Sequence, residues 1–205
     1  MRVLITAGPT REYLDPVRYV SNASSGRIGC ALAKAALEAG HQVTLVLGPS
    51  SAEPPDGAET IRITSAEEMF EAVAARFDAC DVFIASAAVA DYRPVERRPE
   101  KIKKGETHLA VELERTPDIL AEMAQRRKRQ ILVGFCLETE DLERRARGKL
   151  EAKGLDLLVA NGPEAIGADR QDALLITLHG PAKRLHDVTK AELAESILEA
   201  IGTSA

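Results

Sequence analysis

The sequence predicts an α/β protein of Rossmann type, with a doubly wound, mainly parallel sheet and helices on both faces. Short aliphatic runs such as 3–7 and 82–85 alternate with segments of helical periodicity, which is the pattern of repeated βαβ units. Neither an internal repeat nor a linker interrupts the 205 residues, and this length suits one domain with a buried core. We therefore expect a single domain spanning 1–205.

In the first half of the chain, the sequence predicts four strands and two helices. Apolar residues recur on one helical face until Gly40, and Gly48-Pro49 ends the strand that follows. Ser65 and Glu68 have the spacing of a capping box at the start of the second helix. The expected strands are 3–7, 42–47, 61–63 and 82–85, and the expected helices are 28–39 and 65–77.

A long basic loop is expected next, at about 91–108, because this stretch is too polar and too broken by proline and glycine to pack as core. We call it the flap. Thr116-Pro117 is expected to start a helix, and Thr189 with Glu192 forms a second capping box. The remaining expected elements are strands 131–136, 155–160 and 173–178, and helices that begin at 116, span 141–153 and end near Gly202.

Composition excludes several functional classes. The net charge of −5 argues against a general nucleic-acid or membrane-surface binder. No apolar stretch has the length of a membrane span, and Met1 leads into a strand rather than a signal peptide, so we expect a cytoplasmic protein. Cys30, Cys80 and Cys136 lack metal or redox spacing, and the four histidines are scattered, so we predict buried free thiols and no metal site built from protein side chains.

Residues 15–29 place small hydroxyls, glycines and arginines directly ahead of the first expected helix. Ser24 and Ser25 could cap this helix, whose unpaired N–H groups and dipole would attract an anion. Gly26 and Gly29 would let a phosphate approach the backbone. The residues alone leave two interpretations open: a phosphate site, or an ordinary capped helix with two spacer glycines.

Ligands of open α/β sheets bind beyond the carboxyl ends of the strands, so the loops there should hold the functional residues. Arg18 could clamp a phosphate, and Asn22 could hold a carboxyl or amide oxygen. The small residues 85–88 would admit a flat base or a ribose, and Asp91 could accept a hydrogen bond from either. The alternatives are a surface charge for Arg18, a loop cap for Asp91, and solvated charges for Lys101, Lys104, Lys149 and Lys153.

Four stretches, taken together, resemble phosphopantothenoylcysteine synthetase, an enzyme of coenzyme A assembly. They are TAGPTRE at 6–12, DPVRYVSNASSGRIG at 15–29, ASAAVADYRP at 85–94 and KIKK at 101–104, within a likeness that runs from Arg2 to about Thr177. The resemblance implies a nucleotide-binding ligase that joins 4′-phosphopantothenate to cysteine through an acyl-nucleotide, releasing pyrophosphate and CMP. It also implies CTP or ATP with Mg²⁺, and a homodimer for which 109–113 is a candidate pairing segment.

The resemblance also assigns roles to individual residues. Arg18 and Asn22 match positions that bind substrate and stabilise the intermediate, and Lys101 matches the lysine of the flap that closes over the nucleotide. Phe135 matches the base pocket, and Lys149 and Lys153 match the triphosphate site. We predict catalytic roles for Arg18, Asn22 and Lys101, a nucleotide site of Ala85, Ser86, Ala87, Ala88, Asp91, Lys101, Phe135, Lys149 and Lys153, and a phosphate or substrate site of Ser24, Ser25, Gly26 and Asn161.

Departures from the family pattern bear more on the acceptor loop than on the nucleotide site. Thr116 stands where the family usually has Asn, Gly162-Pro163 follows Asn161 in place of Asp, and Asp172-Ala173 replaces a common Asp-Asn pair. A flavin is not expected, because the sequence contains no flavin decarboxylase half.

Two rival functions remain. One is a nicotinamide-dependent reductase, although the strand ending at 46–49 lacks the acidic residue that would hold a ribose, and no tyrosine has a lysine four residues later. The other is a nucleotide-binding module without catalysis.

Overall fold

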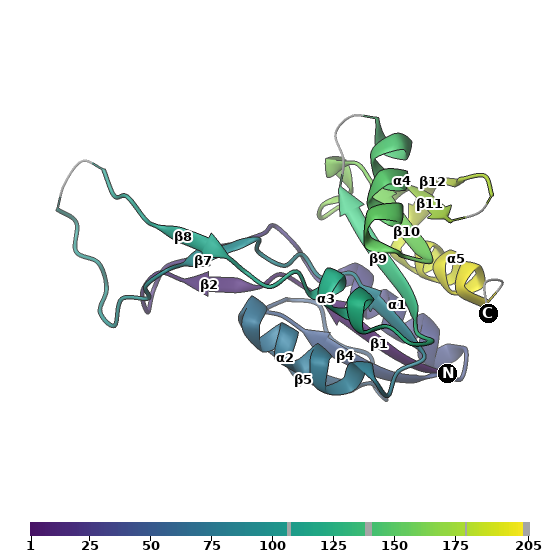
Figure 1. Ribbon diagram of the computed structural model, residues 1–205, viewed down its shortest axis with the longest axis horizontal. Helices are drawn as coiled ribbons and strands as arrows, with labels where there is room; N and C mark the ends of the chain where they lie inside the picture. Colours follow the sequence, from purple (N-terminus) through teal and green to yellow (C-terminus); the bar gives the residue numbers. More distant parts are fainter. Residues whose placement is uncertain (106–107, 138–140, 179, 203–205) are drawn as a thin grey trace.

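The computed structural model describes residues 1–105, 108–137, 141–178 and 180–202. Its centre is an eight-stranded sheet (Figure 1). Six neighbouring strands run parallel, and two at one edge run antiparallel to the strand beside them. In spatial order the strands are β12 (Lys183–Thr189), β11 (Arg170–Thr177), β10 (Leu157–Asn161), β9 (Ile131–Leu137), β6 (Val82–Ala85), β1 (Arg2–Ala7), β4 (Gln42–Leu47) and β5 (Glu59–Arg62).

The parallel strands, numbered along the chain, have the spatial order 3-2-1-4-5-6 of a Rossmann fold, which confirms the expected fold class. Helices cover both faces. α1 (Arg27–Glu38) and α5 (Lys190–Gly202) pack on one face, and α2 (Ala66–Phe77), α3 (Ile119–Arg126) and α4 (Leu142–Lys153) pack on the other. A hydrophobic core lies on each face of the sheet, and alternate residues of β1 pack into the two cores. Ile5 packs on the α1 side and Leu4 on the α2 side.

Two expected capping boxes are confirmed, at α2 and at α5. The Ser65 side chain accepts a hydrogen bond from the Glu68 N–H. At α5 the exchange is reciprocal, because the Glu192 N–H donates to Thr189 Oγ1 over 3.2 Å and the Thr189 N–H donates to Glu192 Oε2 over 2.7 Å. Local sequence was sufficient here because both partners lie three residues apart.

The expected caps of two helices are wrong. Neither Ser24 nor Ser25 caps α1, whose N-cap is Gly26 in the left-handed region with φ 74° and no side-chain cap. Thr116-Pro117 does not begin α3 either, because the helix starts at Ile119 behind the N-cap Asp118. The Thr116 hydroxyl instead donates to the Ala90 carbonyl oxygen over 2.6 Å, a tertiary bond that the local pattern does not reveal.

Five short or exposed strands were not predicted from the sequence. β12 is one of them, because its mostly polar residues form a solvent-facing edge. The others are β2 (Arg11–Tyr13), β3 (Tyr19–Ser21), β7 (Tyr92–Pro94) and β8 (Leu113–Arg115), which pair as β2–β3 and β7–β8. Together with the described parts of their connecting loops they form an arm, residues 11–21, 92–105 and 108–115, that projects from the sheet (Figure 1). The flap lies on this arm, apart from 106 and 107, which are outside the described residues.

None of the helices in the described ranges has the length and apolar character needed to cross a membrane.

Candidate functional site

A cavity of about 750 Å³ opens beyond the carboxyl ends of β1, β6, β9 and β10. It lies at the point between β1 and β6 where the chain reverses the direction in which it adds strands, which is where open α/β sheets bind ligands. Most of the predicted site residues meet here. The cavity is lined by Asn22, Ser24, Ser25, Gly26, Ala85, Ser86, Ala87, Ala88, Asp91, Phe135, Lys149, Lys153 and Asn161, along with other residues.

One wall is the loop and first turn of α1. Gly26 is buried and has a positive φ, and a Cβ there would lie 2.5 Å from Ser50 Oγ. Gly29 lets α1 rest directly on β1, since its Cβ would come 2.3 Å from the Ala7 Cβ. The first turn contains no acidic residue. Its free N–H groups and the helix dipole therefore present partial positive charge to the cavity.

The facing wall is the loop after β6, which is held to the end of β1. Ser86 Oγ donates to the Thr6 carbonyl oxygen over 2.6 Å, and the Ala88 N–H donates to the Gly8 carbonyl oxygen over 2.9 Å. Asn22 joins the two walls, because its Nδ2 donates to the Val89 carbonyl oxygen over 2.8 Å. Small side chains leave the backbone of this wall accessible, as a flat base or a ribose requires.

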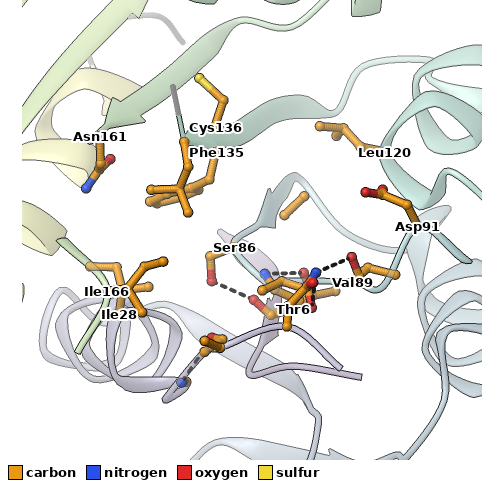
Figure 2. Close-up of a pocket in the computed structure, with 18 of the residues that line it drawn as sticks. Thr6, Ile28, Ser86, Val89, Asp91, Leu120, Phe135, Cys136, Asn161 and Ile166 are labelled. Atoms are coloured by element: carbon orange, nitrogen blue, oxygen red, sulfur yellow. Dashed lines mark hydrogen bonds between the residues drawn. The ribbon is translucent and has the colours of Figure 1, made fainter. Parts of the chain in front are cut away.

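Between the walls, Phe135 extends from β9 into the cavity, with Asp91 on one side and Asn161 on the other (Figure 2). Asn161 is only 6% exposed, and its Oδ1 has no hydrogen-bond partner within the described part of the chain. A buried acceptor left unpaired is costly, so Asn161 is ready to accept a hydrogen bond from a ligand.

Two lysines on α4 reach the cavity from the other side of the sheet. Lys153 Nζ bonds both oxygens of Asp118, at 2.6 and 2.9 Å. Burial raises the pKa of the Asp118 carboxyl, but bonds from Lys153 and the Ala121 N–H and the nearby charge of Lys149 outweigh it, and the pKa falls below its usual value. Lys149 is half-buried and has no ion-pair partner among the residues described, so its charge is available to an anionic ligand.

One end of the cavity contains Lys190, a residue that the sequence did not point to. Lys190 Nζ donates there to the Ala165 carbonyl oxygen over 3.2 Å and to Gln171 Oε1. Burial, and then the charge of Arg27, lower the pKa of Lys190. Lys190 is the first residue of α5, where a positive charge is unfavourable next to the helix dipole. This unfavourable placement was the one feature of the sequence that could have pointed to Lys190.

Arg18 and Lys101 do not line the cavity. Arg18 lies in the turn between β2 and β3, where its guanidinium bonds Asp15 and donates to the Ile102 carbonyl oxygen over 2.7 Å. Lys101 is the exposed neighbour of Ile102 on the flap. The structure thus brings these two predicted residues together on the arm, apart from the other site residues. Within the described ranges, no cluster of three or more His, Cys, Asp and Glu side chains is placed to hold a metal.

Known proteins share this architecture. The family model of the DNA/pantothenate metabolism flavoprotein C-terminal domain matches residues 1–204. The coenzyme A biosynthesis bifunctional protein CoaBC of Bacillus subtilis is 46% identical over 204 residues, covering 97% of this chain and 50% of that protein. The chain thus spans about half the length of the curated relatives it matches.

Two solved structures are also similar. The crystal structure of the C-terminal domain of a CoaBC protein has a TM-score of 0.86 at 40% identity, covering 98% of this chain and 94% of that one. The DNA/pantothenate metabolism flavoprotein of Streptococcus pneumoniae has a TM-score of 0.88 at 26% identity, covering 100% of both chains. From the match over nearly its whole length, the chain belongs to the family of the DNA/pantothenate metabolism flavoprotein C-terminal domain.

Proposed function

We propose that the chain is a phosphopantothenate–cysteine ligase, which joins 4′-phosphopantothenate to cysteine in coenzyme A biosynthesis. Family membership and the CoaBC relatives support this activity. The observation that carries it is the cavity at the strand switch point, where a wall of small residues, the N-terminus of α1 and the lysines of α4 meet. Such a site suits a nucleoside triphosphate: a flat base against the backbone, and phosphates near the positive charge.

The proposed reaction has two steps. The carboxylate of 4′-phosphopantothenate attacks the α-phosphorus of the nucleotide, and pyrophosphate leaves with the P–O bond electrons. The amine of cysteine then attacks the acyl carbon, the nucleoside monophosphate leaves, and the amine loses a proton. Both steps need positioning and charge neutralisation more than a protein nucleophile. In the proposal Arg18, Asn22 and Lys101 are the catalytic residues.

The remaining predicted residues keep their proposed roles. Those of the wall after β6, with Asp91 and Phe135, hold the base and ribose, and the lysines of α4 hold the triphosphate. Ser24, Ser25 and Gly26 face phosphate, and Asn161 offers its unpaired oxygen. CTP is the proposed nucleotide, with ATP as the alternative. Mg²⁺ would arrive on the triphosphate, held by phosphate oxygens and water, and would neutralise charge there.

We also propose that residues 1–205 act as one domain and that the protein is a cytoplasmic homodimer. The two cores share one sheet, which supports a single domain. The three cysteines are free and buried, in keeping with a reducing compartment. The arm exposes Leu109, Val111 and Leu113, which supports pairing with a second copy.

The test is pyrophosphate release by purified protein with Mg²⁺, 4′-phosphopantothenate and either CTP or ATP, with and without cysteine. We expect release that depends on phosphopantothenate, turnover that depends on cysteine, and a loss of about 100-fold in kcat for Asn22→Asp and Lys101→Gln. Lys183→Gln is the matched control, because it removes a lysine charge on β12, outside the cavity.

Other outcomes would favour the rival functions. Nucleotide binding without pyrophosphate release would favour a binding module. Tight binding of NADH or NADPH with no CTP or ATP binding would favour a reductase.

A further inference from the structure

Asp15 is a buried carboxylate that joins the body of the arm to the flap. It lies in the turn between β2 and β3, and its side chain is 0% exposed. Its Oδ1 accepts hydrogen bonds from the N–H groups of Val17 and Arg18, each over 2.8 Å. Its Oδ2 accepts from Arg18 Nε over 2.9 Å, from Arg18 Nη2 over 2.5 Å and from the Ile102 N–H over 3.1 Å.

Arg18 completes the attachment, because its Nη2 also donates to the Ile102 carbonyl oxygen over 2.7 Å. Both backbone polar groups of one flap residue are therefore held by a single Asp–Arg pair that lies 84 to 87 positions earlier in the chain. We call this arrangement the clasp: Asp15, Arg18 and Ile102. Because these groups belong to the two peptide units that flank the Cα of Ile102, the backbone there is fixed in orientation as well as in position.

Two further contacts keep the flap alongside the same turn. The Arg98 N–H donates to the Leu14 carbonyl oxygen over 2.8 Å. The Arg97 guanidinium carbon lies 5.1 Å from the centroid of the Tyr13 ring, a cation–π distance. The flap segment 97–102 thus follows the turn 13–18, and the clasp is its last attachment before Lys103 and Lys104.

The charge of Asp15 is balanced inside the clasp. Burial raises the pKa of its carboxyl, but the hydrogen bonds from Val17, Arg18 and Ile102 outweigh burial and hold the pKa well below its usual range. The carboxylate therefore stays ionised near neutral pH, and its bonds to Arg18 and Ile102 are charge-assisted. Removing that charge would weaken both attachments together.

Lys101 does not hold the flap by its own side chain. It is exposed and forms no hydrogen bond or ion pair with any residue that the structure describes. Its Cα is one peptide from Ile102, about 3.8 Å away. The clasp is consequently the nearest fixed point from which the ammonium group of Lys101 can reach a ligand.

We propose that Asp15 is a positioning residue: its carboxylate fixes the flap at Ile102 through the clasp and thereby determines the position of Lys101. The inference rests on the proposed function, in which Lys101 neutralises charge on the transferring phosphoryl group. Asp15 itself touches neither substrate nor nucleotide in this role.

Asp15→Asn is the main test variant. Its amide oxygen can still accept from the Val17 and Arg18 N–H groups, so the turn is kept. Its amide nitrogen would face the donors of Arg18 and Ile102, so the clasp is lost. Glu12→Gln is the matched control, because Glu12 is also a buried arm carboxylate but accepts from the Ala66 N–H of α2 rather than from the flap.

The first readout is independent of activity. Hydrogen–deuterium exchange of a peptide covering 98–103 should become faster in Asp15→Asn, because the Ile102 N–H loses its acceptor. Exchange in Glu12→Gln should match the wild type. Ile102→Pro is a second variant, which removes the Ile102 N–H and leaves the buried carboxylate of Asp15 in place. If Asp15→Asn fails to fold, Ile102→Pro still tests the inference.

The second readout is turnover. For Asp15→Asn and for Ile102→Pro we expect kcat to fall about 100-fold, with the KM for the nucleotide changed by about threefold or less, since the flap is misplaced while the cavity is intact. In a Lys101→Gln background, adding either substitution should cost about tenfold less than it does alone, because it acts through the missing lysine.

Three outcomes would overturn the inference. The first is unchanged hydrogen exchange in Asp15→Asn, and the second is an equal loss of kcat with and without Lys101. The third is an unchanged kcat in a variant whose flap exchanges faster. A wild-type protein without pyrophosphate release would overturn the proposed function, and with it the role of Lys101. The exchange comparison would still decide whether Asp15 fixes the flap.

Discussion

Asn161 ends β10 and faces the cavity with a buried side-chain amide oxygen that no described residue pairs. Gln130 provides a contrast, since it is equally buried but accepts from the Lys128 and Arg129 N–H groups and donates to the Phe77 carbonyl oxygen. The amide of Gln130 is paired within the fold, and we propose that the free oxygen of Asn161 accepts a hydrogen bond from a ligand.

Asn161→Ala should therefore change the free energy of unfolding of the free protein by less than about 1 kcal/mol. Affinity for 4′-phosphopantothenate should fall about tenfold, or about 1.4 kcal/mol. Gln130→Ala should lower the free energy of unfolding by about 1–3 kcal/mol and leave the affinity for 4′-phosphopantothenate unchanged. Thermal unfolding with and without 4′-phosphopantothenate measures both effects. Equal destabilisation of the two variants, with equal affinity for 4′-phosphopantothenate, would contradict this account.

Asp81 accepts from the Arg2 N–H over 2.8 Å and from Arg2 Nη2 over 2.9 Å, which ties the starts of β6 and β1. The bonds from Arg2 hold the pKa of Asp81 at about 2. Because the folded pKa lies below the unfolded value of about 3.9, the stabilisation is complete above that value and is lost as the pH falls towards 2.

Asp81→Asn should thus lower the free energy of unfolding by about 1 kcal/mol at pH 7, a figure kept small because the side chain of Asp81 is 32% exposed. The difference from wild type should vanish near pH 2. Urea unfolding across this pH range measures it, with Asp78→Asn as the control, because Asp78 makes only one long exposed pair at 3.8 Å. A difference that does not depend on pH would show that the Arg2 bonds are not its source.

At the scale of the secondary-structure elements, the packing of a helix on a strand can depend on a single glycine. α1 meets β1 at Gly29, where a Cβ would lie 2.3 Å from Ala7 Cβ and 2.9 Å from Ser86 Oγ. Gly148 in α4 has open space around it, with nothing within 4 Å of a Cβ. The same substitution should therefore have opposite effects in the two helices.

Gly29→Ala should lower the free energy of unfolding by about 1–3 kcal/mol, since α1 must move away from β1. Gly148→Ala should raise it by up to about 1 kcal/mol, because alanine favours the helix. Chemical denaturation compares the two. The idea of a close helix–strand contact fails if Gly29→Ala is as stable as the wild type.

At the scale of the whole molecule, the arm extends well beyond the sheet (Figure 1). Several of its apolar side chains are exposed. Leu109 is 58% exposed, and Val111 and Leu113 lie on the same segment. Apolar side chains gathered on one projecting segment mark an interaction surface. The proposed homodimer would cover them.

Changing Leu109 and Leu113 together to Glu should give a monomer with a free energy of unfolding within about 0.5 kcal/mol of the wild-type monomer value, because both side chains are exposed. Leu178→Glu is the control, a leucine of 52% exposure at the other end of the molecule that should leave the dimer intact. Sedimentation velocity decides the oligomeric state. A monomeric wild type would rule out the dimer.

The Rossmann architecture and the two capping boxes could be predicted from the sequence, because they depend on local periodicity and on side chains three residues apart. Most of the predicted site residues do line the cavity, but their prediction needed the resemblance to a known family as well as the rule that parallel strands end at one edge. The N-cap of α1, the strands of the arm, the Lys190 end of the cavity and the clasp could be found only in the folded chain. These depend on partners distant in the chain, such as Ile102 for Asp15 and Ala90 for Thr116, and pairing over such distances leaves no periodic pattern in the sequence.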